Sequence, residues 1–151
     1  MRRYPEKLAG LVDLLSSLKD EKERIDLLID FADGYRGVPE EVARRPFDPL
    51  RRVEYCESEA YVWSELRQDG RMKFHFAVEN PQGVSAKALA AIFDATLSGL
   101  TPEEILALPA DIVFDIFGRE LSMGKNLGLT GILFMMQRQT KELVRGQVPS
   151  A

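Results

Sequence analysis

The chain has 151 residues, 45% of them apolar and 29% charged, which is typical of a soluble globular protein of about one domain. Its 24 acidic against 20 basic residues give a net charge of −4, which argues against a nucleic-acid partner because such partners need a concentrated basic face. No apolar run reaches the roughly 18–20 residues of a membrane span, and no signal-peptide core follows the start. We therefore expect one cytoplasmic domain over residues 1–151, with no membrane partner.

Two amphipathic helices are predicted first. Apolar side chains recur at helical spacing over residues 6–18 and predict the first helix. Asp20, with Glu23 three residues later, has the pattern of a capping box and opens a second helix that Gly34 ends. The predicted core face of this second helix consists of Ile25, Leu28, Ile29 and Ala32.

A long connection and a hairpin follow. Residues 35–52 contain several Pro and Gly and little periodicity, and loops of this length inside a compact domain are often functional. Residues 60–67 and 71–79 have the composition and alternation of antiparallel strands. Asp69 and Gly70 between them predict a hairpin turn in which both residues adopt positive φ angles.

The rest of the chain is predicted to be helical. We expect a helix from a Ser85 cap to Leu97, a short helix from Pro102 to Leu106 or Leu108, another over 111–117, and a final helix over 126–143. Thr101 followed by Pro102 is typical of a helix start. The tail from Gly146 onward is expected to fray. The class is α+β, with a small antiparallel sheet of about three strands packed against N- and C-terminal helices and a core over about 7–143.

Cysteine and histidine each occur once, as Cys56 and His75. One thiol forms no internal disulfide, and the two residues are too few for a structural zinc site, so we expect no metal site. Cys56 follows the long connection and precedes a strand, where a nucleophile can be presented to a partner while its backbone stays anchored. The alternative is a small buried apolar side chain, which most lone cysteines are.

Charged residues around Cys56 do not favour a self-activated thiolate. Three carboxylates would raise the pKa of its thiol if they lie close, and two arginines would lower it. The carboxylates are Glu54, Glu57 and Glu59, and the arginines are Arg51 and Arg52. A thiol that another protein activates is consistent with this pattern. A cysteine hydrolase is rejected, because His75 is expected on the exposed polar face of a strand and no oxyanion-hole motif accompanies Cys56.

Glycines cluster around the start of the last predicted helix. Gly124, Gly128 and Gly131 surround Lys125, but the spacing is not that of a phosphate-binding P-loop. Gly124 directly before the helix predicts a close backbone approach, and Lys125 is expected near the positive end of that helix. The alternative is that these residues only cap the helix.

The ordered motifs resemble those of the SufE family of sulfur-acceptor proteins in iron–sulfur cluster assembly. The family pattern Val-x-Gly-Cys-x-Ser-x-Val-Trp is matched, with a longer spacing after the serine, by Val53, Cys56, Ser58, Val62 and Trp63. The segment from Gly99 to Ile105 resembles the family's Thr-Pro-x-x-Ile helix start. The family's His-Leu-x-Pro-Ser-Arg-x-x-Gly-Leu is matched by Leu121, Gly128 and Leu129. The resemblance covers about residues 7–143.

The resemblance implies a fold like that of SufE and of the U-type cluster scaffolds. It implies that Cys56 accepts sulfane sulfur from a PLP-dependent cysteine desulfurase of the SufS type and passes it to an iron–sulfur scaffold complex. The chain would then be a sulfurtransferase-like carrier and desulfurase activator rather than a stand-alone enzyme. No cofactor of its own is implied, because the PLP belongs to the desulfurase. The residues expected to contact the sulfur or the partner are Tyr55, Glu57, Ser58, Arg51, Arg52 and Lys125.

The chain departs from the family pattern at three positions. Tyr55 replaces a glycine and is expected to shield the thiol or to restrict the loop, whereas Glu120 and Lys125 replace a histidine and an arginine. A U-type scaffold is excluded, because it needs about three cysteines. Two alternatives remain, an adaptor that binds a desulfurase while Cys56 is dispensable and a structural module with an unrelated partner. The sequence leaves open whether the chain forms a homodimer.

Overall fold

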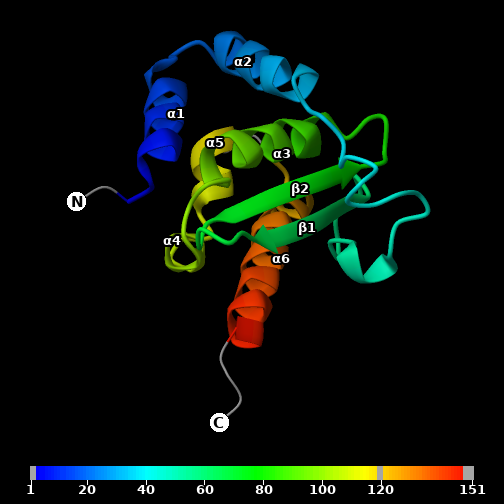
Figure 1. Cartoon of the computed structure of the whole chain (residues 1–151). Coiled ribbons are helices and arrows are strands. Elements are labelled where there is room, and N and C mark those ends of the chain that lie inside the picture. The colour runs from blue at the N-terminus through cyan, green and yellow to red at the C-terminus, as the bar shows by residue number, and fades with distance from the viewer. Residues whose placement is uncertain (1–2, 119–120, 148–151) are drawn as a thin grey trace.

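The computed structural model describes residues 3–118 and 121–147. Its fold is α+β, as predicted, with helices before and after one β-hairpin in the sequence (Figure 1). The helices are α1 (Glu6–Ser17), α2 (Glu21–Asp33), α3 (Val84–Leu97), α4 (Pro102–Leu106), α5 (Ile112–Phe117) and α6 (Met123–Gln147). The strands are β1 (Ala60–Leu66) and β2 (Met72–Val78), and a short 3-10 helix, η1, spans Pro49–Arg51. None of the described helices is both long and apolar enough to cross a membrane.

The sheet is an antiparallel hairpin with Ala60 opposite Val78 and Leu66 opposite Met72. The sequence predicted about three strands, but the described residues form two. An isolated bridge from Arg52 to Tyr61 adds one further pairing beside β1. In the turn Gly70 has a positive φ, of 81°, but Asp69 does not, so the expectation of a positive φ at Asp69 was wrong. The Asp69 carboxylate instead accepts a hydrogen bond from the Arg71 N–H.

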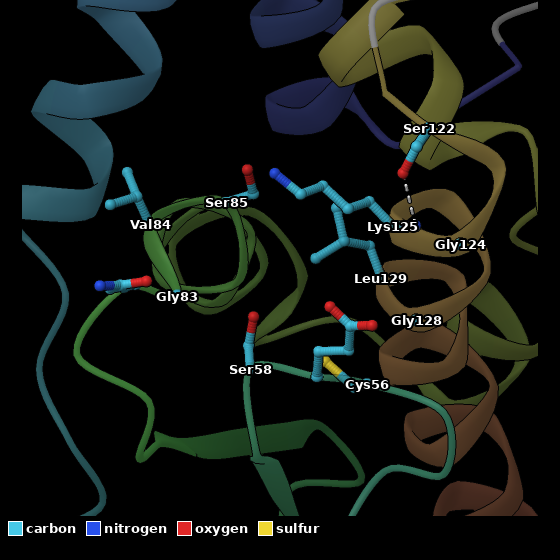
Figure 2. A pocket seen from close by; sticks show the side chains of 12 residues that line it. Cys56, Ser58, Gly83, Val84, Ser85, Ser122, Gly124, Lys125, Gly128 and Leu129 are labelled. Atoms are coloured by element: carbon cyan, nitrogen blue, oxygen red, sulfur yellow. Dashed lines mark hydrogen bonds between the residues drawn. The ribbon is translucent and has the colours of Figure 1, made fainter.

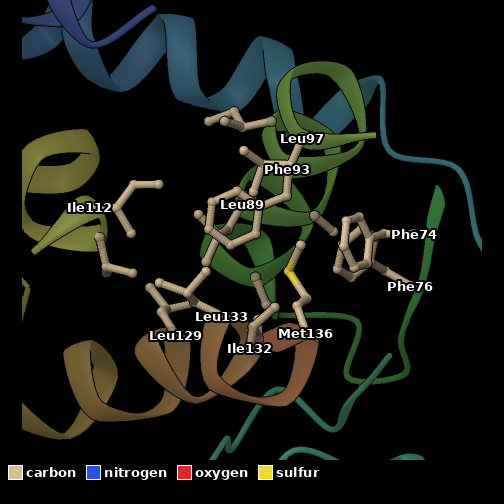
Figure 3. Packing of buried hydrophobic residues seen from close by; sticks show 14 of the residues in the cluster. Phe74, Phe76, Leu89, Phe93, Leu97, Ile112, Leu129, Ile132, Leu133 and Met136 are labelled. Carbon is tan, nitrogen blue, oxygen red and sulfur yellow. The ribbon is translucent and has the colours of Figure 1, made fainter. Parts of the chain in front are cut away.

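Helices cover the hairpin on one side and pack against one another. α3 contacts β2, α6 contacts β1, and α2 lies along the far side of α3 (Figure 1). The core contains fully buried aliphatic and aromatic side chains from β2, α3 and α6, among them Phe74, Phe93, Leu97, Ile132 and Met136 (Figure 3). Burial of such side chains contributes about 1.5–3 kcal/mol each, so this cluster is the main stabilising feature of the fold.

α6 is joined to β1 by a buried polar contact as well. The Gln139 side-chain oxygen accepts a hydrogen bond from the Ser64 hydroxyl at 2.7 Å, and its amide nitrogen donates to the Val62 carbonyl at 2.8 Å. Both polar ends of this buried amide are therefore satisfied, which avoids the desolvation cost of an unpaired group. The contact fixes the rotation of α6 relative to the sheet.

α2 differs from the prediction at its N-terminal cap and along its core face. Asp20 is the N-cap, but its carboxylate accepts from the Lys22 N–H, and no reciprocal Glu23 bond completes a capping box. The core face is also rotated, because Leu27 and Phe31 pack on the core beside Leu28 and Ala32, whereas the predicted Ile25 and Ile29 are exposed. Contact with α3 selects the face that contains the bulky Phe31.

The helix starts near the site show further differences. α3 begins after Gly83, whose N-cap position makes no side-chain bond, so Ser85 lies in the first turn rather than at the cap. α6 begins at Met123, three residues earlier than predicted, because the Ser122 hydroxyl accepts from the Lys125 N–H and caps it. α6 also continues through Gly146, where fraying was predicted, and residues 148–151 lie outside the described residues. The predicted start of α4 at Thr101 and Pro102 is confirmed, and Glu104 completes a capping box there.

Candidate functional site

Cys56 lies in a loop of residues 53–59 that connects η1 to β1. Backbone hydrogen bonds close the base of this loop: the Val53 N–H donates to the Ala60 carbonyl at 2.8 Å, and the Asn80 N–H donates to the Ser58 carbonyl at 3.1 Å. The Glu79 N–H also donates to the Glu59 carbonyl. The two ends of the loop are thus anchored to the hairpin, while Cys56 lies at its tip.

The tip of the loop packs against α6 at two glycines. A Cβ atom on Gly128 would lie 3.0 Å from the Tyr55 carbonyl oxygen and 3.1 Å from the Cys56 Cα atom. A Cβ atom on Gly131 would lie 2.9 Å from a Val53 methyl group. At Gly124, where the sequence predicted the close approach, no atom lies within 4 Å. The prediction of a close approach at Gly124 was therefore wrong, and the close contacts are at Gly128 and Gly131.

The backbone around Cys56 contains two residues with left-handed conformations, Tyr55 at φ 61° and Glu59 at φ 54°. Non-glycine residues rarely adopt this conformation because the Cβ atom crowds the backbone. The Tyr55 side chain is 78% exposed, whereas Cys56 is 6% exposed and belongs to the core cluster. Core side chains and α6 therefore cover Cys56, and the exposed Tyr55 ring does not.

One side of Cys56 faces a pocket of about 170 Å³ between the loop, α3 and α6 (Figure 2). Figure 2 shows Cys56 and Ser58 on one side of the pocket, Leu129 beside them, and Ser85 and Lys125 on the opposite side, with the Lys125 side chain extended in the direction of Ser85. The first turns of α3 and α6 both border it. The remaining lining residues are Glu57, Gln82, Gly83, Val84, Ser122, Gly124 and Gly128.

The other side of Cys56 borders a wider surface hollow of about 860 Å³. Three apolar side chains at this hollow are well exposed: Leu50, Tyr55 and Leu127. Met123, one turn before Leu127 on α6, is also exposed. Exposed apolar side chains that gather in one place are typical of protein interaction sites.

The structure brings most of the predicted site residues together. Glu57, Ser58 and Lys125 line the pocket with Cys56, and Arg52 and Tyr55 line the wider hollow. Arg51 lines neither of them, and Glu120 lies outside the described residues. The sequence did not identify Gly83, Ser85 or Ser122, which reach the pocket only because α3 and α6 begin beside the loop.

His75 is separate from this site. Its Nε2 atom lies 3.2 Å from a Glu65 carboxylate oxygen, and its side chain is 13% exposed rather than well exposed as predicted. It borders neither the pocket nor the hollow at Cys56. A histidine at this place does not act as a general base for the thiol. Within residues 3–118 and 121–147, no group of three His, Cys, Asp or Glu side chains is arranged to hold a metal ion.

An ion pair attaches the long connection to the base of the Cys56 loop. Arg45 donates two hydrogen bonds to the Glu79 carboxylate, at 2.7 and 2.9 Å. The guanidinium beside it holds the pKa of Glu79 below its ordinary value. Because the Glu79 N–H binds the Glu59 carbonyl, the side chain and the backbone of one residue connect the two segments.

Residues 9–140 match the family model described as SufE, Fe-S metabolism associated domain. The chain belongs to the SufE family. Among curated proteins this SufE-family chain is 26% identical over 145 residues to an uncharacterized SufE-like protein from Synechocystis, covering 95% of this chain and 86% of that protein. It is also 26% identical over 160 residues to the chloroplastic quinolinate synthase of Arabidopsis thaliana, covering 97% of this chain and 20% of that protein. The chain therefore spans about a fifth of the length of that synthase.

A solved structure has a similar fold. The solution structure of a hypothetical protein from Thermus thermophilus matches with a TM-score of 0.74 and 24% sequence identity, covering 94% of this chain and 98% of that one. This likeness supports the α+β fold. The family supports a role in iron–sulfur metabolism for this SufE-family chain.

Proposed function

We propose that this chain is a sulfur carrier of iron–sulfur cluster assembly. In this proposal Cys56 takes sulfane sulfur from a PLP-dependent cysteine desulfurase of the SufS type and passes it to a cluster scaffold complex. The observation that carries the proposal is the position of the chain's one thiol, at the tip of an anchored loop and beside exposed apolar side chains. The chain itself carries no cofactor in this scheme, and the transfer takes place in the cytoplasm.

The transfer is a thiol–persulfide exchange. The Cys56 thiolate attacks the terminal sulfur of the desulfurase persulfide, a new sulfur–sulfur bond forms at Cys56, and the desulfurase cysteine leaves as a thiolate. The thiol proton of Cys56 passes to solvent or to a group of the desulfurase. The reaction changes no overall oxidation state, and it needs access to the thiolate rather than a Cys–His dyad, which agrees with the distant position of His75.

Access is the step that needs movement, because Cys56 is buried. We infer that the tip of the 53–59 loop moves outward, within the segment 50–59, when the desulfurase docks against Leu50, Tyr55 and Leu127. The anchors at Val53 and Ser58 can remain in place during this movement, because they lie on either side of the tip. Hydrogen exchange of residues 50–59, measured with and without bound desulfurase, tests the inference. We expect faster exchange at the tip in the complex, and unchanged exchange throughout would contradict the movement.

The burial of Cys56 also favours one alternative, an adaptor that stimulates a desulfurase without carrying sulfur. Turnover of L-cysteine by the desulfurase, measured with the wild-type chain and with Cys56→Ser, separates the two functions. A carrier loses its stimulation in Cys56→Ser, whereas an adaptor keeps it. A pull-down of the desulfurase by Cys56→Ser shows that the variant still binds, so that loss of stimulation is assigned to the missing thiol.

A further inference from the structure

The pocket beside Cys56 is larger than sulfane sulfur requires. A persulfide adds a single sulfur atom to Cys56, whereas the pocket volume is about 170 Å³. The remaining space can admit a small molecule. The pocket opens to solvent along a rim of exposed residues that includes Glu57 and Lys125, so a small molecule can reach it without movement of the loop.

The polar groups of the pocket carry both signs of charge. Lys125 extends over it from the first turn of α6, and the first turn of α3 borders it at Ser85 (Figure 2). A carboxylate is favoured there by the ammonium group and by the positive ends of two helices. Glu57, directly after Cys56 in the loop, supplies a negative charge that suits an ammonium group. Ser58, Ser85 and Ser122 add hydroxyl groups that can donate or accept hydrogen bonds.

We propose that this pocket binds a small zwitterionic thiol of the free-cysteine type and exchanges sulfane sulfur between that thiol and Cys56. The ligand carboxylate lies toward Lys125, its ammonium group toward Glu57, and its sulfur toward the Cys56 thiol. The proposal rests on the proposed function, because it requires that Cys56 carries sulfane sulfur. It adds a small-molecule acceptor that reaches the sulfur through the pocket, while protein partners require the loop to open.

The exchange balances without an oxidant or reductant. The thiolate of the small ligand attacks the terminal sulfur of the Cys56 persulfide, and the bond between that sulfur and the Cys56 Sγ atom breaks. The electron pair of the broken bond stays on Sγ as a thiolate, which takes a proton from solvent. The ligand leaves as its persulfide. The reverse reaction loads Cys56 from a small persulfide.

Three small thiols test the proposal, because L-cysteine carries both charged groups and each of two analogues lacks one of them. Cys56 is loaded with sulfur from inorganic polysulfide, the protein is desalted, and L-cysteine, cysteamine or 3-mercaptopropionate is added at equal thiolate concentration. Cysteamine lacks the carboxylate and 3-mercaptopropionate lacks the ammonium group, and both are smaller than cysteine, so exclusion by size does not explain a slower reaction. Loss of the added sulfur from the intact mass gives the rate. We expect cysteine to react about fivefold faster than either analogue, since each partly exposed ion pair contributes about 1 kcal/mol or less.

Charge variants assign the two contacts. Lys125→Gln is expected to slow the reactions of cysteine and 3-mercaptopropionate but not that of cysteamine. Glu57→Gln is expected to slow the reactions of cysteine and cysteamine but not that of 3-mercaptopropionate. The matched controls Lys141→Gln, at the far end of α6, and Glu103→Gln, on α4, are expected to change none of the three rates. Both control residues are exposed and lie away from the pocket.

Three results would overturn the proposal. The first is that the three thiols remove the sulfur at equal rates. The second is that a charge variant slows the reaction of all three thiols by the same factor. The third is that polysulfide fails to load Cys56. The outcome is separable from that of the proposed function. Loading by polysulfide with the expected ranking, but no loading by any desulfurase, would reject the sulfur-carrier function and keep the thiol site. Loading by a desulfurase, with equal rates for the three thiols, would keep the sulfur-carrier function and reject the thiol site.

Discussion

At the scale of single residues, Tyr55 and Cys56 form an unusual pair. Tyr55 has a left-handed backbone with an exposed ring, and the next residue turns its side chain into the core. The left-handed backbone at Tyr55 allows the chain to reverse direction between the two side chains. The SufE pattern has glycine at this position, which adopts the same conformation without strain. Tyr55 therefore holds a backbone conformation that favours glycine, at an energetic cost.

The variant Tyr55→Gly is expected to raise stability. A left-handed conformation costs a non-glycine residue about 1–2 kcal/mol, and glycine costs about 0.5–1 kcal/mol in conformational freedom. We expect the free energy of unfolding, measured in urea, to rise by about 0.5–1 kcal/mol. The control is Glu54→Gly, at an exposed position of the same loop whose backbone is not left-handed. This change is expected to lower the free energy of unfolding. Equal destabilisation by both changes would show that Tyr55 is not strained.

At the scale of elements, the contact between α6 and the 53–59 loop positions the thiol. Gly128 and Gly131 lie one turn apart on the face of α6 that meets the loop, and neither position has room for a side chain. The contact also borders the pocket, because Gly128 and Leu129 line it together with Cys56. A change in this contact should therefore alter both stability and access to the thiol.

We expect Gly128→Ala to destabilise the protein and to expose Cys56. The new methyl group would collide with backbone atoms of Tyr55 and Cys56, and overpacking of this kind costs about 1–3 kcal/mol. Alkylation by iodoacetamide reports on Cys56 alone, because the chain has one cysteine. The alkylation rate should rise in Gly128→Ala and stay near the wild-type rate in Gly124→Ala, where a methyl group meets no atom within 4 Å. Equal rates in the two variants would mean that this contact does not hold the loop.

The elements that sequence patterns predict well are those with local causes. The alternation over 71–79 and the helix start at Thr101 and Pro102 have causes within a few residues, and both are confirmed. The core face of α2 was predicted in part, because contact with α3 decides between neighbouring rows of apolar side chains. The starts of α3 and α6 were displaced for a similar reason, since Ser85 and Gly124 fit either a cap or a first turn.

The candidate site was predictable in its centre but not in its surroundings. The motif around Cys56 identified the thiol and its neighbours Glu57 and Ser58. The pocket depends on tertiary packing, because Ser85 and Ser122 come from distant segments and carry no local signal. The close approach was predicted at Gly124, whereas the helix positions that meet the loop are Gly128 and Gly131.

At the scale of the whole molecule, the long connection over 35–52 is held to the hairpin at several points. Tyr35 accepts a hydrogen bond from the Val78 N–H, Phe47 packs against the rings of Tyr61 and Trp63, and Arg45 pairs with Glu79. These contacts keep the connection over the outer face of the sheet. They also place η1 and the Cys56 loop where β1 begins.

The Arg45–Glu79 pair predicts a pH dependence of stability. The pKa of Glu79 is lowered in the folded state from its ordinary value of 4.5, so the stabilisation is present above that value and is lost as pH falls through the lower folded pKa. We expect Glu79→Gln to lower the free energy of unfolding at pH 7 and the difference from wild type to shrink as the pH falls below 4.5. Glu40→Gln, at an exposed position of the same connection, is the control. A difference that is independent of pH would mean that the ion pair does not contribute.

The most direct test of the account is the intact mass of the chain after incubation with a cysteine desulfurase and L-cysteine in the absence of reductant. The account predicts a gain of one or more sulfur atoms that dithiothreitol reverses and that Cys56→Ser does not show. An unchanged mass with several desulfurases, although a complex forms, would contradict the sulfur-carrier function and identify the chain as an adaptor.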